Sequence, residues 1–180
     1  MMRSIIAIIL FGISAIGAHF LTLHLVPSVI MNATQTRLAD QGLPPNQWAA
    51  SPRMTPQTQT IVRPSPDLSY SICRFDVREG AVLIKAPGWD GYGSLSVFDA
   101  RTNNVFVANL DGEDAGVLLY HPNRPPKQEG RFYSRQNEET IAFSGEGLAL
   151  IRRLAPDAET HERAVDLVDQ AVCAPVNWAP

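Results

Sequence analysis

Residues 66–104 read PDLSYSICRFDVREGAVLIKAPGWDGYGSLSVFDARTNN and hold three strand candidates with turns between them. In residues 68–77 the side chains alternate, which places on one side Tyr70, Ile72, Arg74 and Asp76 and on the other Ser71, Cys73, Phe75 and Val77. Two further runs, residues 81–86 and 92–98, are bounded by turn-forming residues. Alternation of this kind predicts antiparallel strands with one buried and one partly solvated face.

More strands of similar length follow along the chain. They are predicted at residues 105–110, 116–120, 131–134, 140–143 and 148–152. Short strands at even spacing are typical of a sandwich or a small barrel. A closing helix is predicted to begin at Pro156, with an apolar face made by Ala158, His161, Val165, Val168 and Val172. The sequence therefore predicts a mainly β fold, an antiparallel β-sandwich or jelly-roll-like domain with a C-terminal helix.

An almost uncharged segment precedes this body. Residues 5–26 read IIAIILFGISAIGAHFLTLHLV, and as a helix they would rise about 33 Å, enough to cross a bilayer core of about 30 Å. Arg3 lies on the leading side, and no charge follows until Arg37. The positive-inside rule then predicts a single-pass transmembrane helix in the cytoplasmic (inner) membrane, with the body in the periplasm.

A cleaved signal peptide is the alternative, with residues 5–13 as its apolar core and residues 15–17 as its cleavage site. The apolar run continues beyond that site to Val26, which favours a retained anchor. Both alternatives export the body.

Residues 27–66 connect the two parts. Residues 27–41 predict a short helix that either lies on the membrane surface or extends the anchor, with Gly42 as its stop. Residues 43–66 hold six of the fourteen prolines, which predicts an extended linker because proline fixes φ and lacks a donor. Trp48 is expected to pin this linker to the body. The expected division is 1–42 anchor, 43–66 linker and 67–180 domain.

The chain has two cysteines, Cys73 and Cys173. An even number in an exported domain favours a disulfide, which would tie the first core strand to the C-terminal tail. In the chain-entropy estimate, closing so long a loop contributes about 4–5 kcal/mol. The alternative is a pair of unbonded buried thiols.

Composition and motifs argue against several functions. The net charge is −3 with no basic excess, so nucleic acid is not an expected partner, because such binders need clustered Lys and Arg. The sequence has no C-x-x-C, H-x-H, H-E-x-x-H or G-x-S-x-G pattern and no phosphate-binding glycine loop. No metal or cofactor is therefore predicted.

Three polar residues near the core strands are the candidates for chemistry. Asp67 and Tyr70 could line a pocket with Asp67 as a base, and Asp99 lies at the end of the third strand. The alternative is structural: Asp67 caps the turn after Pro66 through an Asx bond, Tyr70 is an ordinary strand aromatic, and Asp99 closes the turn that follows it.

Motifs of this core resemble those of a known bacterial family. They are PDLSYS at 66–71, VLIKAP at 82–87 and YGSLSVFDA at 92–100, followed by TN at 102–103. Their order over roughly residues 63–172 is similar to the domain of unknown function 1254, in its short, membrane-anchored form. Ser65 and Leu68 depart from the Asn and Thr of longer members, whose long second half this chain lacks. The resemblance implies a β-rich, jelly-roll-like exported domain and no established activity.

The expected function is that of a non-catalytic envelope protein that binds a small polar ligand or a partner protein. One alternative is a hydrolase- or isomerase-like enzyme that uses Asp67 and Tyr70 on a small polar or carbohydrate substrate. Another is an accessory subunit of a larger membrane assembly. A cleft that joins Asp67, Tyr70 and Asp99 would favour the enzyme, and a flat surface would favour the binding protein.

Overall fold

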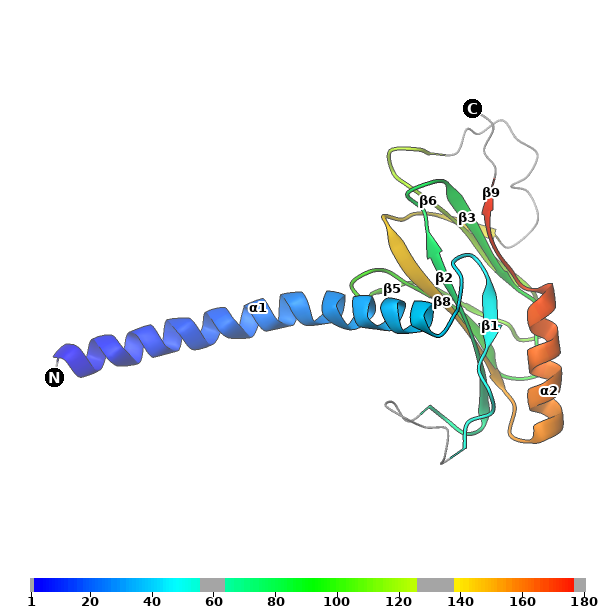
Figure 1. Ribbon diagram of the computed structural model, residues 1–180, viewed down its shortest axis with the longest axis horizontal. Helices are drawn as coiled ribbons and strands as arrows, with labels where there is room; N and C mark the ends of the chain where they lie inside the picture. The colour runs from blue at the N-terminus through cyan, green and yellow to red at the C-terminus, as the bar shows by residue number, and fades with distance from the viewer. Residues whose placement is uncertain (1, 56–63, 126–137, 177–180) are drawn as a thin grey trace.

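A computed structural model of the protein describes residues 2–55, 64–125 and 138–176. One long helix projects from a body built mainly of strands, and a second, short helix lies on the side of the body away from the projecting end (Figure 1). The predicted mainly β fold, with a C-terminal helix and a preceding apolar helix, is confirmed.

The body contains two sheets. The five-stranded sheet has the order β1-β2-β8-β4-β5, with bounds Trp48–Ala50, Leu68–Asp76, Glu146–Leu154, Gly93–Phe98 and Asn104–Asn109. The four-stranded sheet has the order β7-β6-β3-β9, with bounds Glu138–Ala142, Ala115–Tyr120, Ala81–Ala86 and Val172–Val176. Among the described strand pairs, β6 and β7 are parallel, and the other pairs are antiparallel, as predicted. In the sequence, 17 residues separate the end of β6 at Tyr120 from the start of β7 at Glu138, which is enough for the crossover that a parallel pair requires.

Side chains of both sheets meet in one hydrophobic core. The buried side of β2 carries Ser71, Cys73 and Phe75, as the alternation predicts. The core members from the two sheets include Phe75, Leu95, Val97 and Ile151 from one and Val82, Ile84, Val117 and Leu119 from the other. Each such side chain contributes about 1.5–3 kcal/mol when it is removed from water.

The predicted linker contains one strand. β1 pairs with β2 from Trp48 opposite Cys73 to Ala50 opposite Ser71, and Trp48 packs against the core, as expected. Since β1 is an edge strand, the prolines around it interrupt no central ladder. Residues 56–63 and the strand predicted at 131–134 lie outside the described residues.

The C-terminal helix ends earlier than predicted. α2 spans Ala158–Asp166, begins with a capping box between Asp157 and Thr160, and passes into a 3-10 turn at Leu167–Gln170. The chain then forms β9, so Cys173 is delivered by a strand rather than by the helix. Pairing with β3 prevails because valines favour strands, and the proline of β9 is tolerated at a sheet edge.

Cys73 of β2 and Cys173 of β9 form the predicted disulfide. The bond links the two sheets across the core, and the two cysteines are 100 residues apart in the sequence. Both residues are almost fully buried.

α1 spans Met2–Asp40 and continues through Pro27. The short helix expected at residues 27–41 is therefore an extension of the anchor segment. α1 is long and apolar enough to cross a membrane, and the apolar window of this helix is not covered by any other described part of the chain. Beyond the apolar run, α1 has two buried residues, Met31 and Gln35, which lie against the body.

Gln35 fastens α1 to the body. Its Nε2 donates a hydrogen bond to the Gly147 carbonyl at 3.1 Å, and its Oε1 accepts one from Arg74 Nε at 3.0 Å. Arg74 also donates to the Leu43 carbonyl at 2.9 Å, beyond the end of the helix. A side chain at position 147 would collide with the ring of Phe75. The helix is thus joined to the body where β2 and β8 meet.

The disulfide predicts a measurable loss of stability on reduction. We expect the full chain, refolded in detergent with dithiothreitol, to unfold in urea with a free energy lower by about 4–5 kcal/mol than the oxidised chain, because the unfolded state gains loop freedom. Comparing the oxidised and reduced forms of one chain avoids the cavity that a substitution would leave. Equal free energies of unfolding, or two thiols that react with iodoacetamide in the unreduced, denatured chain, would contradict the bond.

Candidate functional site

Polar side chains gather on the face of the five-stranded sheet that is turned away from the core, near the end of β8, and two of them, Ser94 and Ser96, are buried there. Arg152 of β8 lies directly opposite Tyr70 of β2 on one side and Ser94 of β4 on the other. Side chains directly opposite one another in antiparallel strands have Cβ atoms about 4.5–5.5 Å apart. Two more residues adjoin this row, and we call the whole group the Arg152 cluster: Tyr70, Tyr92, Ser94, Ser96 and Arg152.

Arg152 is the cation at the centre of this cluster. Its Nη2 donates a long hydrogen bond of 3.3 Å to Ser96 Oγ. Its Nε is buried and has no partner among the described residues. Within the described residues no carboxylate lies in ion-pair range of it either. The guanidinium therefore keeps donors for an acceptor that the rest of the described chain does not supply.

Besides Ser96, the hydroxyl-bearing residues Tyr70 and Ser94 are the strand neighbours of Arg152. The Tyr92 and Ser94 hydroxyls are 3.4 Å apart. The Tyr70 hydroxyl accepts a hydrogen bond from the Ser65 backbone N–H at 2.9 Å, so its own proton remains available. A cation flanked by hydroxyl donors matches a carboxylate, phosphate or sulfate group.

Asp67, the predicted base, lies at the same end of the sheet. Its carbonyl accepts a hydrogen bond from the Ala155 backbone N–H, just after β8. Its backbone N–H donates to Ser65 Oγ at 3.4 Å, so Ser65, and not an Asx bond from Asp67, closes this turn. The Asp67 residue is exposed, and its carboxylate has no hydrogen bond among the described residues.

Asp99 lies at the other end of β8. It follows Phe98, which pairs with Leu148, about 23 Å along the strand from Ala155 at about 3.3 Å per residue. Its carboxylate accepts hydrogen bonds from the backbone N–H groups of Arg101 and Asn103 and from the Asn103 side chain, at 2.8–2.9 Å. Asp99 therefore closes the turn between β4 and β5. The structure brings Asp67 and Tyr70 to one end of the sheet and does not bring Asp99 to them.

Arg153, the next residue, points into the body. Only 1% of it is exposed, and it donates hydrogen bonds to the carbonyls of Pro87 at 3.0 Å and Ala164 at 3.5 Å. Burial lowers the pKa of Arg153 to about 10, so it still carries its charge at neutral pH. The guanidiniums of Arg153 and Arg163 both lie over the Trp89 ring, with Cζ 5.9 Å and 5.3 Å from its centroid. Arg153 thus fastens α2 to the sheet.

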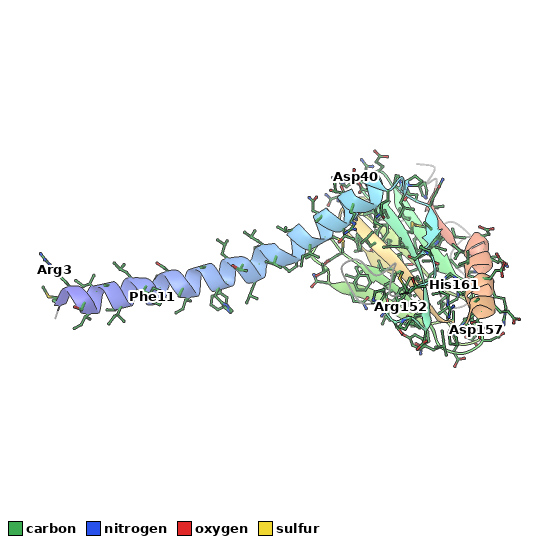
Figure 2. All side chains as sticks on the ribbon, turned by 60° about the horizontal axis from the view of Figure 1, so that its bottom comes forward. Arg3, Phe11, Asp40, Arg152, Asp157 and His161 are labelled. Atoms are coloured by element: carbon green, nitrogen blue, oxygen red, sulfur yellow. A yellow bond between two sulfur atoms is a disulfide. The ribbon has the colours of Figure 1, made fainter. Side chains whose placement is uncertain are left out.

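Neither Arg152 nor Arg153 is among the functional residues predicted from the sequence. The available signal was the pair Arg152-Arg153 at the end of a predicted strand, because a period of two places one of them in the core and one outside. Figure 2 shows Arg152 on the body, far from Arg3 at the free end of α1. The cluster, as defined here, contains a cation and four hydroxyls, and no carboxylate or imidazole to act as a base.

Among the solved structures that match part of this chain are two from uncharacterised proteins. A crystal structure of a Vibrio parahaemolyticus protein has a TM-score of 0.60 and 12% identity, and the match covers 83% of this chain and 35% of that one. A Burkholderia cenocepacia protein has a TM-score of 0.40 and 14% identity, and the match covers 66% of this chain and 33% of that one. This chain thus spans about a third of the length of either protein.

No protein of curated function matches the chain. Residues 45–175, which include both sheets and α2, match the family described as protein of unknown function (DUF1254). The chain is a member of this family.

Proposed function

We propose that the chain is a single-pass inner-membrane protein whose body faces the periplasm and binds a small acidic ligand at the Arg152 cluster, without catalysis. The observation that carries the ligand class is the Arg152 guanidinium, which has hydroxyl neighbours and no carboxylate partner among the described residues. A charge-assisted contact to an anion would use the Nη donors of Arg152, for which the long bond to Ser96 Oγ is the hydrogen bond that the described residues supply.

The proposed placement rests on two properties of the chain. The apolar window of α1 has a mean hydropathy of 2.2, and none of it is buried, so a bilayer is the solvent that suits it. The Cys73–Cys173 bond is of the kind that persists in oxidising compartments such as the periplasm. Arg3, which precedes the apolar run of α1, supports an N-terminus in the cytoplasm.

The positions of the three predicted residues on the sheet favour binding over reaction. Asp67 and Asp99 lie at opposite ends of the sheet, so no cleft joins the three predicted residues. Asp67 and Tyr70 lie at one end, which keeps the hydrolase- or isomerase-like alternative open to test. A protein partner in the envelope that presents an acidic side chain would use the same chemistry.

A retained anchor predicts an intact N-terminal segment. Intact-mass spectrometry of the protein extracted from carbonate-washed membranes should give the mass that includes α1, and protease added to spheroplasts should degrade the body. The apolar run through Val26 would hold the chain in the bilayer. A mature protein that starts at Ala18 would refute the anchor, and a body protected in spheroplasts would refute the orientation.

The Arg152 cluster predicts a preference for charged over neutral ligands. Titrations of the full chain in nanodiscs should show that glucuronate binds and that glucose does not. Arg152→Gln should weaken binding of glucuronate by about 10- to 100-fold, the equivalent of a charged hydrogen bond of about 1.5–3 kcal/mol. Arg37→Gln removes an exposed arginine of α1 and should leave binding unchanged. Equal binding of both sugars, or wild-type affinity in Arg152→Gln, would overturn the ligand assignment.

Asp67 and Asp99 provide a matched pair that tests the catalytic alternative. Asp99→Ala removes three hydrogen bonds and should lower the free energy of unfolding by about 1–3 kcal/mol. Asp67→Ala removes no side-chain hydrogen bond formed within residues 2–55, 64–125 and 138–176 and should leave both stability and ligand affinity unchanged. An activity on a carbohydrate or small acid that is lost in Asp67→Ala at unchanged melting temperature would instead establish the enzyme.

A further inference from the structure

We propose that the turn between β4 and β5, residues 99–103, rests in the phospholipid headgroup layer where α1 leaves the bilayer, with the Arg101 guanidinium on a lipid phosphate. This proposal depends on the proposed membrane crossing of α1, and it adds the position of the body relative to the bilayer surface. The partner is the outer leaflet of the membrane that α1 crosses.

The position of His24 relative to the bilayer follows from its distance from Arg3 along α1. From Arg3 to His24 an α-helix rises about 32 Å, close to the thickness of a bilayer core of about 30 Å. When Arg3 lies among the headgroups of the leading leaflet, His24 therefore reaches the headgroups of the other leaflet. Leu25, Val26, Val29 and Ile30 also remain exposed, so apolar surface extends about 9 Å beyond His24.

The second step is the contact between the body and this point of the helix. Arg101 Nη2 lies 3.1 Å from His24 Nδ1, and the arginine must be the donor because a guanidinium accepts no hydrogen bond. Arg101 belongs to the turn that Asp99 holds closed through its hydrogen bonds to Arg101 and Asn103. The turn is thus a rigid part of the body placed at headgroup depth.

The third step is the rigidity of the junction. Gln35 is 6% exposed and bonds both Gly147 of β8 and Arg74 of β2. Met31 is buried in the same contact. The proline-rich residues 43–66 follow this contact in the chain, so they do not separate the body from the helix. The body must therefore move with α1.

The fourth step is the charge of the turn. A guanidinium has five N–H donors, and the hydrogen bonds of the described residues engage the Arg101 side chain only at His24. No carboxylate among the described residues forms an ion pair with it. Phosphates are the acceptors that the headgroup layer offers at this depth, and arginine binds them in a bidentate manner.

A hollow beside the turn fits the same environment. It has a volume of about 330 Å³, opens between α1 and the body, and is lined by residues that include Ser28, Asn32, Gln35, Arg78, Ala100 and Glu146. Ser28 and Asn32 lie about 6 and 12 Å beyond His24 along the helix. Met31 belongs to the lining as well, so apolar and polar side chains share this hollow, which leaves room for lipid between the helix and the turn.

Depth-dependent quenching tests the proposal on the full chain in phosphatidylethanolamine–phosphatidylglycerol nanodiscs. A bimane label at Ala100→Cys, attached without reductant so that the disulfide persists, should be quenched strongly by lipid with a nitroxide on its headgroup. The same label at Glu162→Cys on α2, which lies on the far side of the body (Figure 1), should be quenched several-fold less.

Charge variants test the phosphate contact. In the Gln35→Ala background, in which Gln35 no longer fastens the body to α1, Arg101→Gln should reduce the quenching at Ala100→Cys several-fold. Arg37→Gln, about 20 Å beyond His24 along α1, should not. Equal quenching in both variants would overturn the role of Arg101.

A third label separates this proposal from the anchor itself. Bimane at Ile16→Cys, within the apolar run, should be quenched by lipid with a nitroxide on its acyl chain. If it is quenched while Ala100→Cys behaves like Glu162→Cys, the anchor stands and the docked turn is overturned. If Ile16→Cys is not quenched, the membrane crossing fails and the docked turn fails with it.

Discussion

The hydrogen-bonded ladder between β2 and β8 is the constraint on which the rest of this structure depends. It runs without a break from Leu68 opposite Leu154 to Asp76 opposite Glu146. A slip of one residue would exchange the faces of every side chain in one strand. Such a slip would turn Cys73 away from Cys173 and carry Arg152 into the core. The disulfide, the packed core and the polar face are therefore consequences of one register.

The two ends of β8 serve different parts of the molecule. At its start, the Gly147 carbonyl receives Gln35 of α1, because glycine leaves room beside the ring of Phe75. Near its end, Arg152 stands on the solvent face with Tyr70 and Ser94 beside it. The strand thus separates the point where α1 joins the body from the proposed ligand site by about 16 Å, at about 3.3 Å per residue. A ligand at the proposed site would therefore lie away from the junction with α1.

The adjacent residues Arg152 and Arg153 of β8 have different roles. Arg153 is buried without a carboxylate partner among the described residues, and the carbonyls of Pro87 and Ala164 together with the Trp89 ring replace part of the water that it loses. Its Nε, like that of Arg152, has no partner among the described residues. A buried charge is costly unless such polar groups surround it. Burial of Arg153 therefore favours the folded α2, which supplies the Ala164 carbonyl. Arg152 lacks equivalent partners, which is why its free donors point to an external anion rather than to the fold.

Sequence by itself determined the strand-rich body, the apolar leading helix, the buried side of β2 and the two cysteines, because periods of two and runs of apolar residues are local properties. It also identified the Asp99 turn, since aspartate closes such turns through its own backbone neighbours. Tertiary structure alone decided that Asp67 and Asp99 lie at opposite ends of β8, that the last helix yields to β9, and that α1 is held to the body by Gln35. These outcomes depend on contacts between residues distant in the chain, and strand pairing, unlike alternation, leaves no trace in a single segment.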